Sequence, residues 1–210
     1  PTFLEGVDLG ECVRRATRNM VGGAREGGAV KHIDLTTYGA EEPFDLVYSI
    51  GVIHHLKLPR LGFDAVVRNV KPGGRFHCWV YAHEGNAIVR WLVDPVRKLA
   101  CKLPWWATKY LTATPLVAPY FSYARLIRKL LAGSRFAFLP LHAYSLWIAP
   151  RDFAFFRHVA FDQLVTPQTT YIRRSTVDEW LGHHPDVEPD STYVIFRNGN
   201  SWKFGGRKRT

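Results

Sequence analysis

Apolar, strand-like runs alternate with amphipathic helical segments over the first part of the chain. A helix is predicted over residues 9–20, where Val13, Ala16 and Met20 share one face, and a second one over residues 61–70. The predicted strands cover residues 3–8, 30–34, 44–52 and 75–81. Strands that alternate with helices at such short spacing are typical of an α/β fold, Rossmann-like, with a mostly parallel sheet and helices on both faces.

The pattern changes beyond residue 83. Residues 85–150 predict several helices that are interrupted by prolines, and each proline removes an amide donor and caps or kinks a helix. We therefore expect a partial core at residues 1–83 and a helical insertion, or lid, at residues 84–168. Residues 169–210 are then expected to complete the core with a helix and a strand pair, because 210 residues can form one sizeable core.

The C-terminal residues return to the first pattern. A helix is predicted over residues 175–184, with Ser175 as its N-cap and two acidic residues in its first turn. Two strands, residues 191–198 and 201–208, are expected to be joined by a tight Gly-Asn turn. The last residues, 205–210, are expected to fray as a basic tail.

Composition narrows the class of protein. With 47% apolar and 22% charged residues, the chain is globular rather than collagen-like, coiled-coil or wholly disordered. Three separated cysteines without a CxxC pair indicate neither a disulfide framework nor a metal site. No signal peptide and no apolar run of membrane-spanning length is visible, so a cytoplasmic location is expected, with the option of peripheral membrane contact.

The positive charge is concentrated in the predicted insertion. The whole chain carries a formal charge of +10, and residues 85–150 hold nine Lys or Arg against one acid, Asp94, together with eleven aromatic residues. Cations interleaved with Trp and Leu suit a helix in a lipid headgroup layer, or a lid over an apolar small molecule. The alternative is that these helices simply pack on the core with a solvated basic face. Binding of single-stranded nucleic acid ranks lower, because no RNA-binding signature accompanies the basic and aromatic residues.

Polar residues end several of the predicted strands. Asp8 and Asp34 end the first two strands, Ser49-Ile50-Gly51 ends the third, and Tyr81 ends the fourth. In open α/β sheets, ligands bind beyond the carboxyl ends of the strands, and a carboxylate there can accept hydrogen bonds from both ribose hydroxyls. Asp8 suits that role; its alternative is the N-cap of the helix predicted over residues 9–20.

Three stretches, GVDLGE, HIDLTTYGAEEPFDLVYSIGVIHHL and NVKPGGRFHCWVY, together resemble a known family core over residues 3–82. The family is that of the class I S-adenosylmethionine-dependent methyltransferases, in particular the branch with ubiquinone and menaquinone methylating enzymes. The cluster Gly22-Gly23-Gly27-Gly28 does not belong to this resemblance, because it follows a helix and makes no phosphate cradle.

The resemblance implies S-adenosylmethionine as cofactor and assigns its contacts. Asp8, with Leu9 beside it, would hold the ribose hydroxyls, and Asp34 would face the adenine amino group. Leu35 would pack beside the adenine ring. The methionine end would be lined by Ser49, Ile50 and Gly51. Asp34 has an alternative role as a turn residue before Thr36 and Thr37.

The family's first strand and its Gly-rich loop would precede Pro1. The resemblance therefore implies that the sequence is N-terminally truncated, that the sheet lacks a central strand, and that this chain binds the cofactor weakly or not at all.

Methyl transfer from a sulfonium requires alignment of donor and acceptor, and in some cases a base. The candidate bases are His54, His55 and His83, since neutral imidazole can accept a proton near neutral pH. His55 could equally be a packed histidine that hydrogen-bonds backbone. Three further polar candidates are ranked as turn formers before any functional role: Asp162, Asn198 and Asn200.

The predicted activity is methyl transfer to a hydrophobic or lipid-like small molecule. Two alternatives stay open: a non-catalytic binding module that docks on membrane or nucleic acid, and an RNA methyltransferase.

Overall fold

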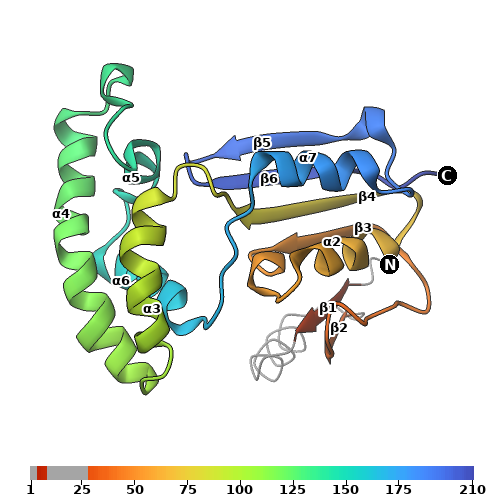
Figure 1. Cartoon of the computed structure of the whole chain (residues 1–210), viewed down its shortest axis with the longest axis horizontal. Helices are drawn as coiled ribbons and strands as arrows, with labels where there is room; N and C mark the ends of the chain where they lie inside the picture. Colours follow the sequence, from red (N-terminus) through yellow and green to blue (C-terminus); the bar gives the residue numbers. More distant parts are fainter. Residues whose placement is uncertain (1–3, 9–27) are drawn as a thin grey trace.

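The computed structural model describes residues 4–8 and 28–210 (Figure 1). The predicted helix at residues 9–20, most of the glycine cluster and Leu9 lie outside the described residues, as does the side chain of Asp8. The strands are β1 (Leu4–Asp8), β2 (Gly28–His32), β3 (Phe44–Ile50), β4 (Val70–Tyr81), β5 (Tyr193–Arg197) and β6 (Ser201–Arg207). The helices are α2 (Pro59–Arg68), α3 (Asp94–Ala100), α4 (Thr114–Leu130), α5 (His142–Ile148), α6 (Phe153–Val165) and α7 (Arg174–His183). Shorter turns of helix are η1 (Ile53–His55), η2 (Val89–Val93), η3 (Ala107–Ala113), η4 (Ser134–Phe136) and η5 (Pro189–Ser191).

The strands form two groups. One group is a four-stranded sheet in the order β3-β4-β6-β5, in which β3 and β4 are parallel and the other two pairings are antiparallel. The other group is the parallel pair β1-β2. The predicted α/β fold is thus confirmed, with a mixed sheet: the predicted hairpin near the C-terminus adds its two strands in antiparallel fashion.

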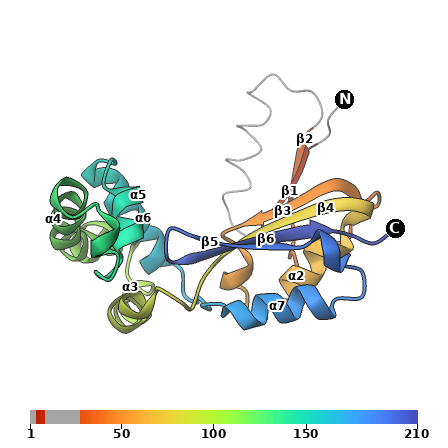
Figure 2. The same cartoon turned by 90° about the horizontal axis from the view of Figure 1, so that it is seen from above.

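Strand β4 has two different faces because its side chains alternate. Phe76, Cys78 and Val80 are fully or almost fully buried, and they join a core to which α2 and α7 contribute. Figure 2 shows α2 and α7 on the same face of the four-stranded sheet. The opposite face of β4 carries larger, half-buried side chains, His77 and Trp79 among them. The strand therefore separates a core from a face that is free to bind a ligand.

Phe63 of α2 occupies the middle of this core. Its ring stacks on Trp180 of α7 at 5.5 Å between centroids, and it meets Phe76 at 5.7 Å and Phe204 at 6.0 Å. Aromatic rings at these separations add to the stabilisation that comes from buried area.

The helices between β4 and α7 form a second part of the molecule, beside the end of β4 (Figure 1). Val117 and Ala124 of α4 pack against Ile148 of α5 and Phe156 of α6 in a core of their own. None of the helices that the structure describes is long and apolar enough to cross a bilayer.

Arg97 fixes α3 to α6 from a buried position. Its guanidinium donates to a carboxylate oxygen of Asp94 at 2.6 Å and to the backbone carbonyl of Gln163, also at 2.6 Å. The hydroxyl of Tyr171 donates to the same Asp94 oxygen at 3.2 Å. A buried cation needs such partners, because an unpaired charge in the interior is costly.

The predicted N-cap of the last helix is wrong. Helix α7 begins at Arg174, with Arg173 at the cap position, and Ser175 and the two acidic residues do not cap it. The carboxylate of Glu84, distant in sequence, accepts the backbone N–H of Arg174 at 3.0 Å and satisfies one of the free amides at the helix start. Asp178 instead accepts from the Arg174 side chain at 2.9 Å.

The hairpin is confirmed, whereas the fraying tail is wrong. Asn198 and Gly199, with φ of 51° and 68°, form the turn between β5 and β6. Gly205 and Gly206 belong to β6: Gly205 pairs with both β4 and β5, and Gly206 pairs with β4. Beyond the strand, the N–H of Arg209 donates to the carbonyl of Asp186 at 2.8 Å, so the last residues are tied to the sheet rather than free.

Replacing Phe63 by alanine is expected to lower the free energy of unfolding by about 3 to 5 kcal/mol, because the cavity left among the three aromatic rings cannot collapse fully. Urea unfolding followed by circular dichroism measures the change. Leu61→Ala, in the same helix but with its side chain 47% exposed, is the matched control, with an expected loss below about 0.5 kcal/mol. Equal losses in the two variants would contradict the position of the core.

Candidate functional site

Two cavities lie beside the end of β3 and have one residue in common. The first, which we call the inter-sheet cavity, has a volume of about 290 Å³ and is lined by residues from β1, β3, α2 and the loop that follows β2. The second, the aromatic cavity, has a volume of about 380 Å³ and lies between β3, β4, the β5–β6 hairpin, α5 and α6. Ile50, the last residue of β3, lines both.

The inter-sheet cavity contains three of the seven residues predicted to bind the cofactor: Leu35, Ser49 and Ile50. Gly51 lies next to them, with a φ of 77°, and its N–H donates to the carbonyl of Trp79 at 3.1 Å. A side chain there would be strained by the positive φ, which explains why a glycine turns the chain at this point. The apolar wall of the cavity includes Val7 and Val52.

Ser49 carries an unsatisfied hydroxyl in this cavity. The residue is only 6% exposed, and its Oγ has no hydrogen-bond partner among the described residues. A buried hydroxyl without a partner costs free energy, and native structures rarely retain one without a reason. The group is therefore available to a polar atom of a ligand.

Asp34 forms a turn. Its carboxylate accepts the N–H and the hydroxyl of Thr36, both at 2.8 Å, and its backbone carbonyl accepts the N–H of Tyr38 at 2.9 Å. These hydrogen bonds, the backbone one above all, lower the pKa of the exposed carboxyl. The turn alternative is thus present in the structure, and β2 ends at His32, two residues before Asp34. Asp8 pairs in register with that same His32, so the two acids follow adjacent strand ends.

His54 is the most buried of the three predicted bases. It is 0% exposed, and neither ring nitrogen has a hydrogen-bond partner among the described residues. Burial lowers its pKa to about 2, with smaller contributions from His55 and Arg97. Its ring packs 4.5 Å from that of Tyr81. A neutral imidazole of such low basicity is a packing group and a poor proton acceptor.

His55 is half-buried and tied to a distant loop. Its Nδ1 lies 3.0 Å from the carbonyl oxygen of Gln168, which requires a proton on Nδ1 and leaves Nε2 as the basic nitrogen. Burial lowers its pKa, the Gln168 carbonyl raises it, and Arg97 lowers it. The packed alternative, hydrogen-bonded to backbone, is what the structure shows, with the carbonyl coming from another loop.

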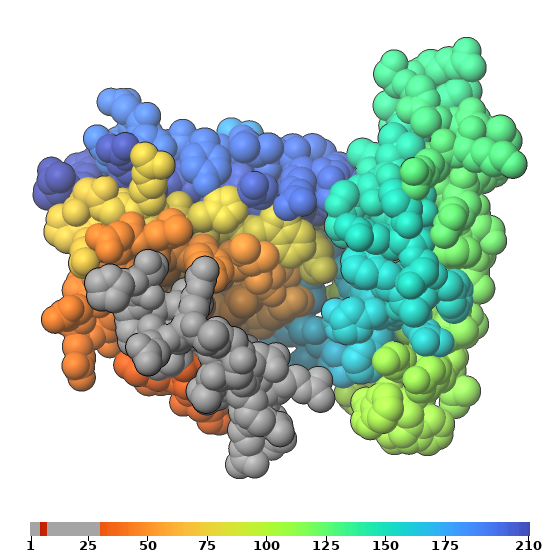
Figure 3. All heavy atoms as spheres, turned by 180° about the vertical axis from the view of Figure 1, so that it is seen from behind, coloured from red at the N-terminus to blue at the C-terminus, as the bar shows by residue number. Residues whose placement is uncertain are grey.

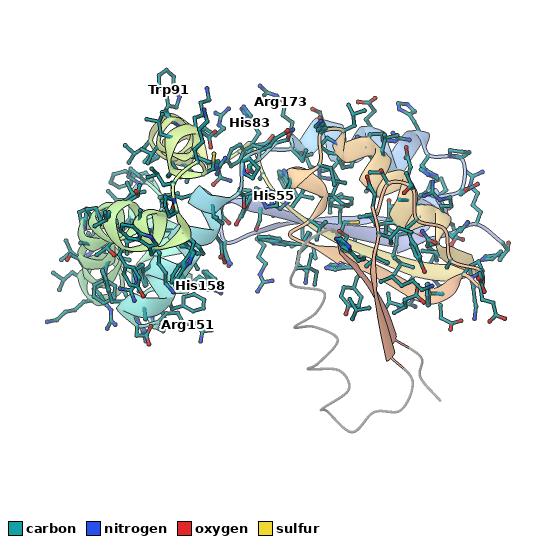
Figure 4. All side chains as sticks on the ribbon, turned by 90° about the horizontal axis from the view of Figure 1, so that it is seen from below. His55, His83, Trp91, Arg151, His158 and Arg173 are labelled. Carbon is teal, nitrogen blue, oxygen red and sulfur yellow. The ribbon has the colours of Figure 1, made fainter. Side chains whose placement is uncertain are left out.

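His83 is directed elsewhere. The guanidinium of Arg90 donates to its Nε2, and its own backbone N–H donates to the carbonyl of Ile172 at 2.8 Å. Burial and the charges of Arg90 and Arg173 lower its pKa. Figure 4 shows His83 beside Arg173 and separated from His55. The three histidines therefore do not form one site.

The aromatic cavity was not predicted as a unit. Its apolar wall consists of Trp79 and Tyr81 from β4 and Tyr144 and Trp147 from α5, together with Ile50. The sequence pattern that could have predicted this cavity is the alternation of His77, Trp79 and Tyr81 with small or apolar residues. Large amphipathic rings on one face of a strand suit a binding surface. Figure 3 shows α5 and α6, in teal, against the sheet near the β5–β6 hairpin.

Polar side chains from α6 and from the β5–β6 hairpin also line this cavity. Asp162, Arg197, Asn198, Asn200 and Lys203 contribute to its lining. Asp162 lies in α6, so its interpretation as a turn former is wrong, whereas Asn198 does form the turn. Desolvation raises the pKa of the Asp162 carboxyl, opposed by His158 and Lys109.

No three His, Cys, Asp or Glu side chains are grouped to hold a metal ion within the part of the chain that the structure describes.

Comparison with known proteins supports the fold and part of the resemblance. Residues 5–78 match the model of the family described as "Methyltransferase domain", which confirms the likeness to methyltransferases over this stretch. An uncharacterised protein of a Synechococcus strain is 38% identical over 56 residues, a match that covers 27% of this chain and 13% of that protein. The branch that methylates ubiquinone and menaquinone stays a prediction.

Two solved structures share the fold. A possible exported protein from Bordetella parapertussis superposes with a TM-score of 0.54 at 15% identity, over 99% of this chain and 54% of that chain. The structure of PKMT2 from Rickettsia typhi in complex with AdoHcy gives a TM-score of 0.55 at 9% identity, over 98% of this chain and 45% of that chain. The chain thus spans about half the length of these relatives, and the likeness confirms a Rossmann-like α/β fold.

His54 is expected to make the protein sensitive to mild acid. Its pKa is about 2 in the folded chain against an ordinary 6.5, so below pH 6.5 the unfolded chain binds a proton that the folded chain excludes. Stability is then lost as the pH falls from 6.5. Between about pH 7 and pH 5 the wild type should lose about 2 kcal/mol more than His54→Gln.

Urea unfolding at the two pH values measures this difference. His183→Gln, exposed in the last turn of α7, is the control and should keep the acid sensitivity of the wild type. The same loss in His54→Gln as in the wild type would show that His54 is protonated in the folded protein.

Proposed function

We propose that this chain carries the donor and acceptor sites of an S-adenosylmethionine-dependent methyltransferase that acts on a hydrophobic or lipid-like small molecule. The observation that supports this most is the position of Ile50, which lines both cavities at the end of β3. A donor in the inter-sheet cavity and an acceptor in the aromatic cavity would meet there. The match of residues 5–78 to a methyltransferase domain supports the same assignment.

The end of the inter-sheet cavity at Leu35, Ser49 and Ile50 is where the resemblance places the cofactor, whereas the rest of the cavity runs along β1 and β3. Leu35, Val7 and Val52 provide apolar surface for a purine, and Ser49 offers its unpaired hydroxyl to a polar atom. When bound, the cofactor supplies a methyl group on a sulfonium, together with its own leaving group. As the resemblance implies, we assign Asp8 to the ribose hydroxyls of the cofactor and Asp34 to its adenine amino group.

The aromatic cavity fits the acceptor. Its rings, Trp79, Tyr81, Tyr144 and Trp147, provide flat apolar surface that excludes water, while the polar lining residues would hold the acceptor in one orientation. Asp162, with a raised pKa, is the group best placed to accept a proton from an acceptor hydroxyl. Because the donor carries its leaving group, orientation is the main contribution required of the protein.

In this proposal the three predicted segments have distinct tasks. Residues 1–83 hold the cofactor, and residues 84–168 close over the acceptor, since α5 and α6 provide one wall of the aromatic cavity. Residues 169–210 complete the sheet and supply the hairpin residues Arg197 and Lys203. The alternative is a binding module that keeps the fold without the activity, and cofactor binding distinguishes the two.

Calorimetric titration of the 210-residue chain with S-adenosylhomocysteine tests the proposal. Weak but saturable binding is expected, in keeping with the weak binding that the resemblance implies, and Val52→Trp, which fills the inter-sheet cavity, should weaken it further by about tenfold or more. Ser49→Ala should weaken it about two- to tenfold, the effect of one hydrogen bond. Val159→Trp is the matched control, because it fills the aromatic cavity instead and should leave the affinity unchanged.

Two outcomes would contradict the proposal. If the wild type shows no saturable binding, the chain lacks a cofactor site of its own. If Val52→Trp binds as tightly as the wild type, the cofactor lies outside the inter-sheet cavity.

A further inference from the structure

The helical segment at residues 87–100 and the first part of the segment at residues 105–130 bury one side against α6. Val93, Val96 and Ala100 from the first helix pack with Ala113 and Leu116 from the second, against Leu164 of α6. Small and β-branched residues predominate on this inner side. It leaves their outer sides without a partner in the part of the chain that the structure describes.

The outer side is apolar, which is the reverse of the usual pattern. The exposed apolar residues of the first helix recur at helical spacing: Ile88, Trp91, Leu92 and Leu99. Trp91 is 83% exposed and Leu99 is 72% exposed. Figure 4 shows Trp91 projecting away from the rest of the molecule. A surface helix normally presents polar residues to water, so an exposed apolar stripe of this kind marks a contact surface.

The stripe continues past Pro104 into the next helix. Leu103, Trp105, Trp106, Tyr110 and Leu111 are all exposed, Leu111 at 66%. We call this surface the interfacial face and define it by its exposed apolar members: Ile88, Trp91, Leu92, Leu99, Leu103, Trp105, Trp106, Tyr110 and Leu111.

Apart from Asp94, the charged residues of the same segments are all Lys or Arg. Lys98 and Lys102 are exposed among the apolar residues, and Lys109 lies half-buried beside them. From residue 95 to residue 151 the sequence contains no Asp or Glu. The acid nearest in sequence, Asp94, is bound to Arg97 on the inner side. A partner that meets the interfacial face therefore meets Lys98 and Lys102, whereas Lys109 also interacts with the Asp162 carboxylate of α6.

We propose that the interfacial face docks on the surface of an anionic lipid bilayer. Trp and Leu can enter the boundary between headgroups and acyl chains, where indole rings are favoured, while lysines meet lipid phosphates at the level of the headgroups. The helices lie on the bilayer rather than cross it, since none is long and apolar enough to do so among the described residues. A nucleic acid would use the cations but would leave isolated Leu side chains in water.

The proposal goes beyond methyl transfer and does not depend on it. Helix α6 contributes to both regions of the molecule: Val159 and Asp162 line the aromatic cavity, and Leu164 packs beneath the interfacial face.

Vesicle cosedimentation of the full 210-residue chain tests the proposal. The wild type is expected to bind phosphatidylcholine vesicles that contain about one third phosphatidylglycerol, and to bind pure phosphatidylcholine more weakly. The triple variant Trp91→Ser/Leu99→Ser/Leu111→Ser should lose about tenfold or more in apparent affinity, because three inserted side chains are removed.

The matched control removes three exposed apolar residues from the α/β part: Leu58→Ser/Leu61→Ser/Ile195→Ser. It should bind vesicles as the wild type does. Thermal unfolding checks that both triple variants are folded; if the first is not, Trp91→Ser alone should still lose affinity about threefold or more.

Two results with vesicles would overturn the proposal: no binding by the wild type, or equal binding by the wild type and the triple variant of the interfacial face. Two results without lipid would also overturn it: dimerisation of the wild type, or its binding to single-stranded RNA, that the same triple variant abolishes. Titration with S-adenosylhomocysteine on the same samples reports separately on the cofactor site, so the two proposals can fail independently.

Discussion

The two-faced strand β4 is the constraint on which the rest of the structure depends. Because successive side chains point to opposite sides, Phe76, Cys78 and Val80 must be buried together, and α2 and α7 cover them. The same geometry turns Trp79 and Tyr81 to the other side, where they meet α5 and α6 around the aromatic cavity. The core and the ligand surface are consequences of one alternation.

The end of β3 lies between the two cavities that we propose as donor and acceptor sites. Ile50 stands between the cavities, and Gly51 allows the chain to leave the strand with a positive φ beside Trp79. Ser49, one residue earlier, points its hydroxyl to a place without a protein partner. A donor and an acceptor that approach from opposite sides of one strand end are the arrangement that an in-line transfer requires.

The helical part differs from the α/β part because it has apolar residues on both its inner and its outer side. Its inner side packs on α6 and is fixed by the buried Arg97, while its outer side exposes Trp91, Leu99 and Leu111. Apolar exposure on this scale destabilises a protein in water and is useful only against a partner. A lipid-like acceptor and a bilayer surface are consistent with each other, although each is tested by its own experiment.

The sequence by itself determined the elements whose signal is local. The alternation of β4, the apolar run of β3 and a turn between β5 and β6 are visible because a strand period and a tight turn depend on the residues at hand. The positive φ values of that turn lie at Asn198 and Gly199, one residue before the predicted Gly-Asn pair. Tertiary structure decided whatever depends on distant partners. Glu84 rather than Ser175 caps α7, since a carboxylate from another loop reaches its first amide, and a backbone carbonyl of a remote loop fixes His55. The aromatic cavity combines residues from β3 to β6 and from two helices, and no spacing along the chain could bring them together.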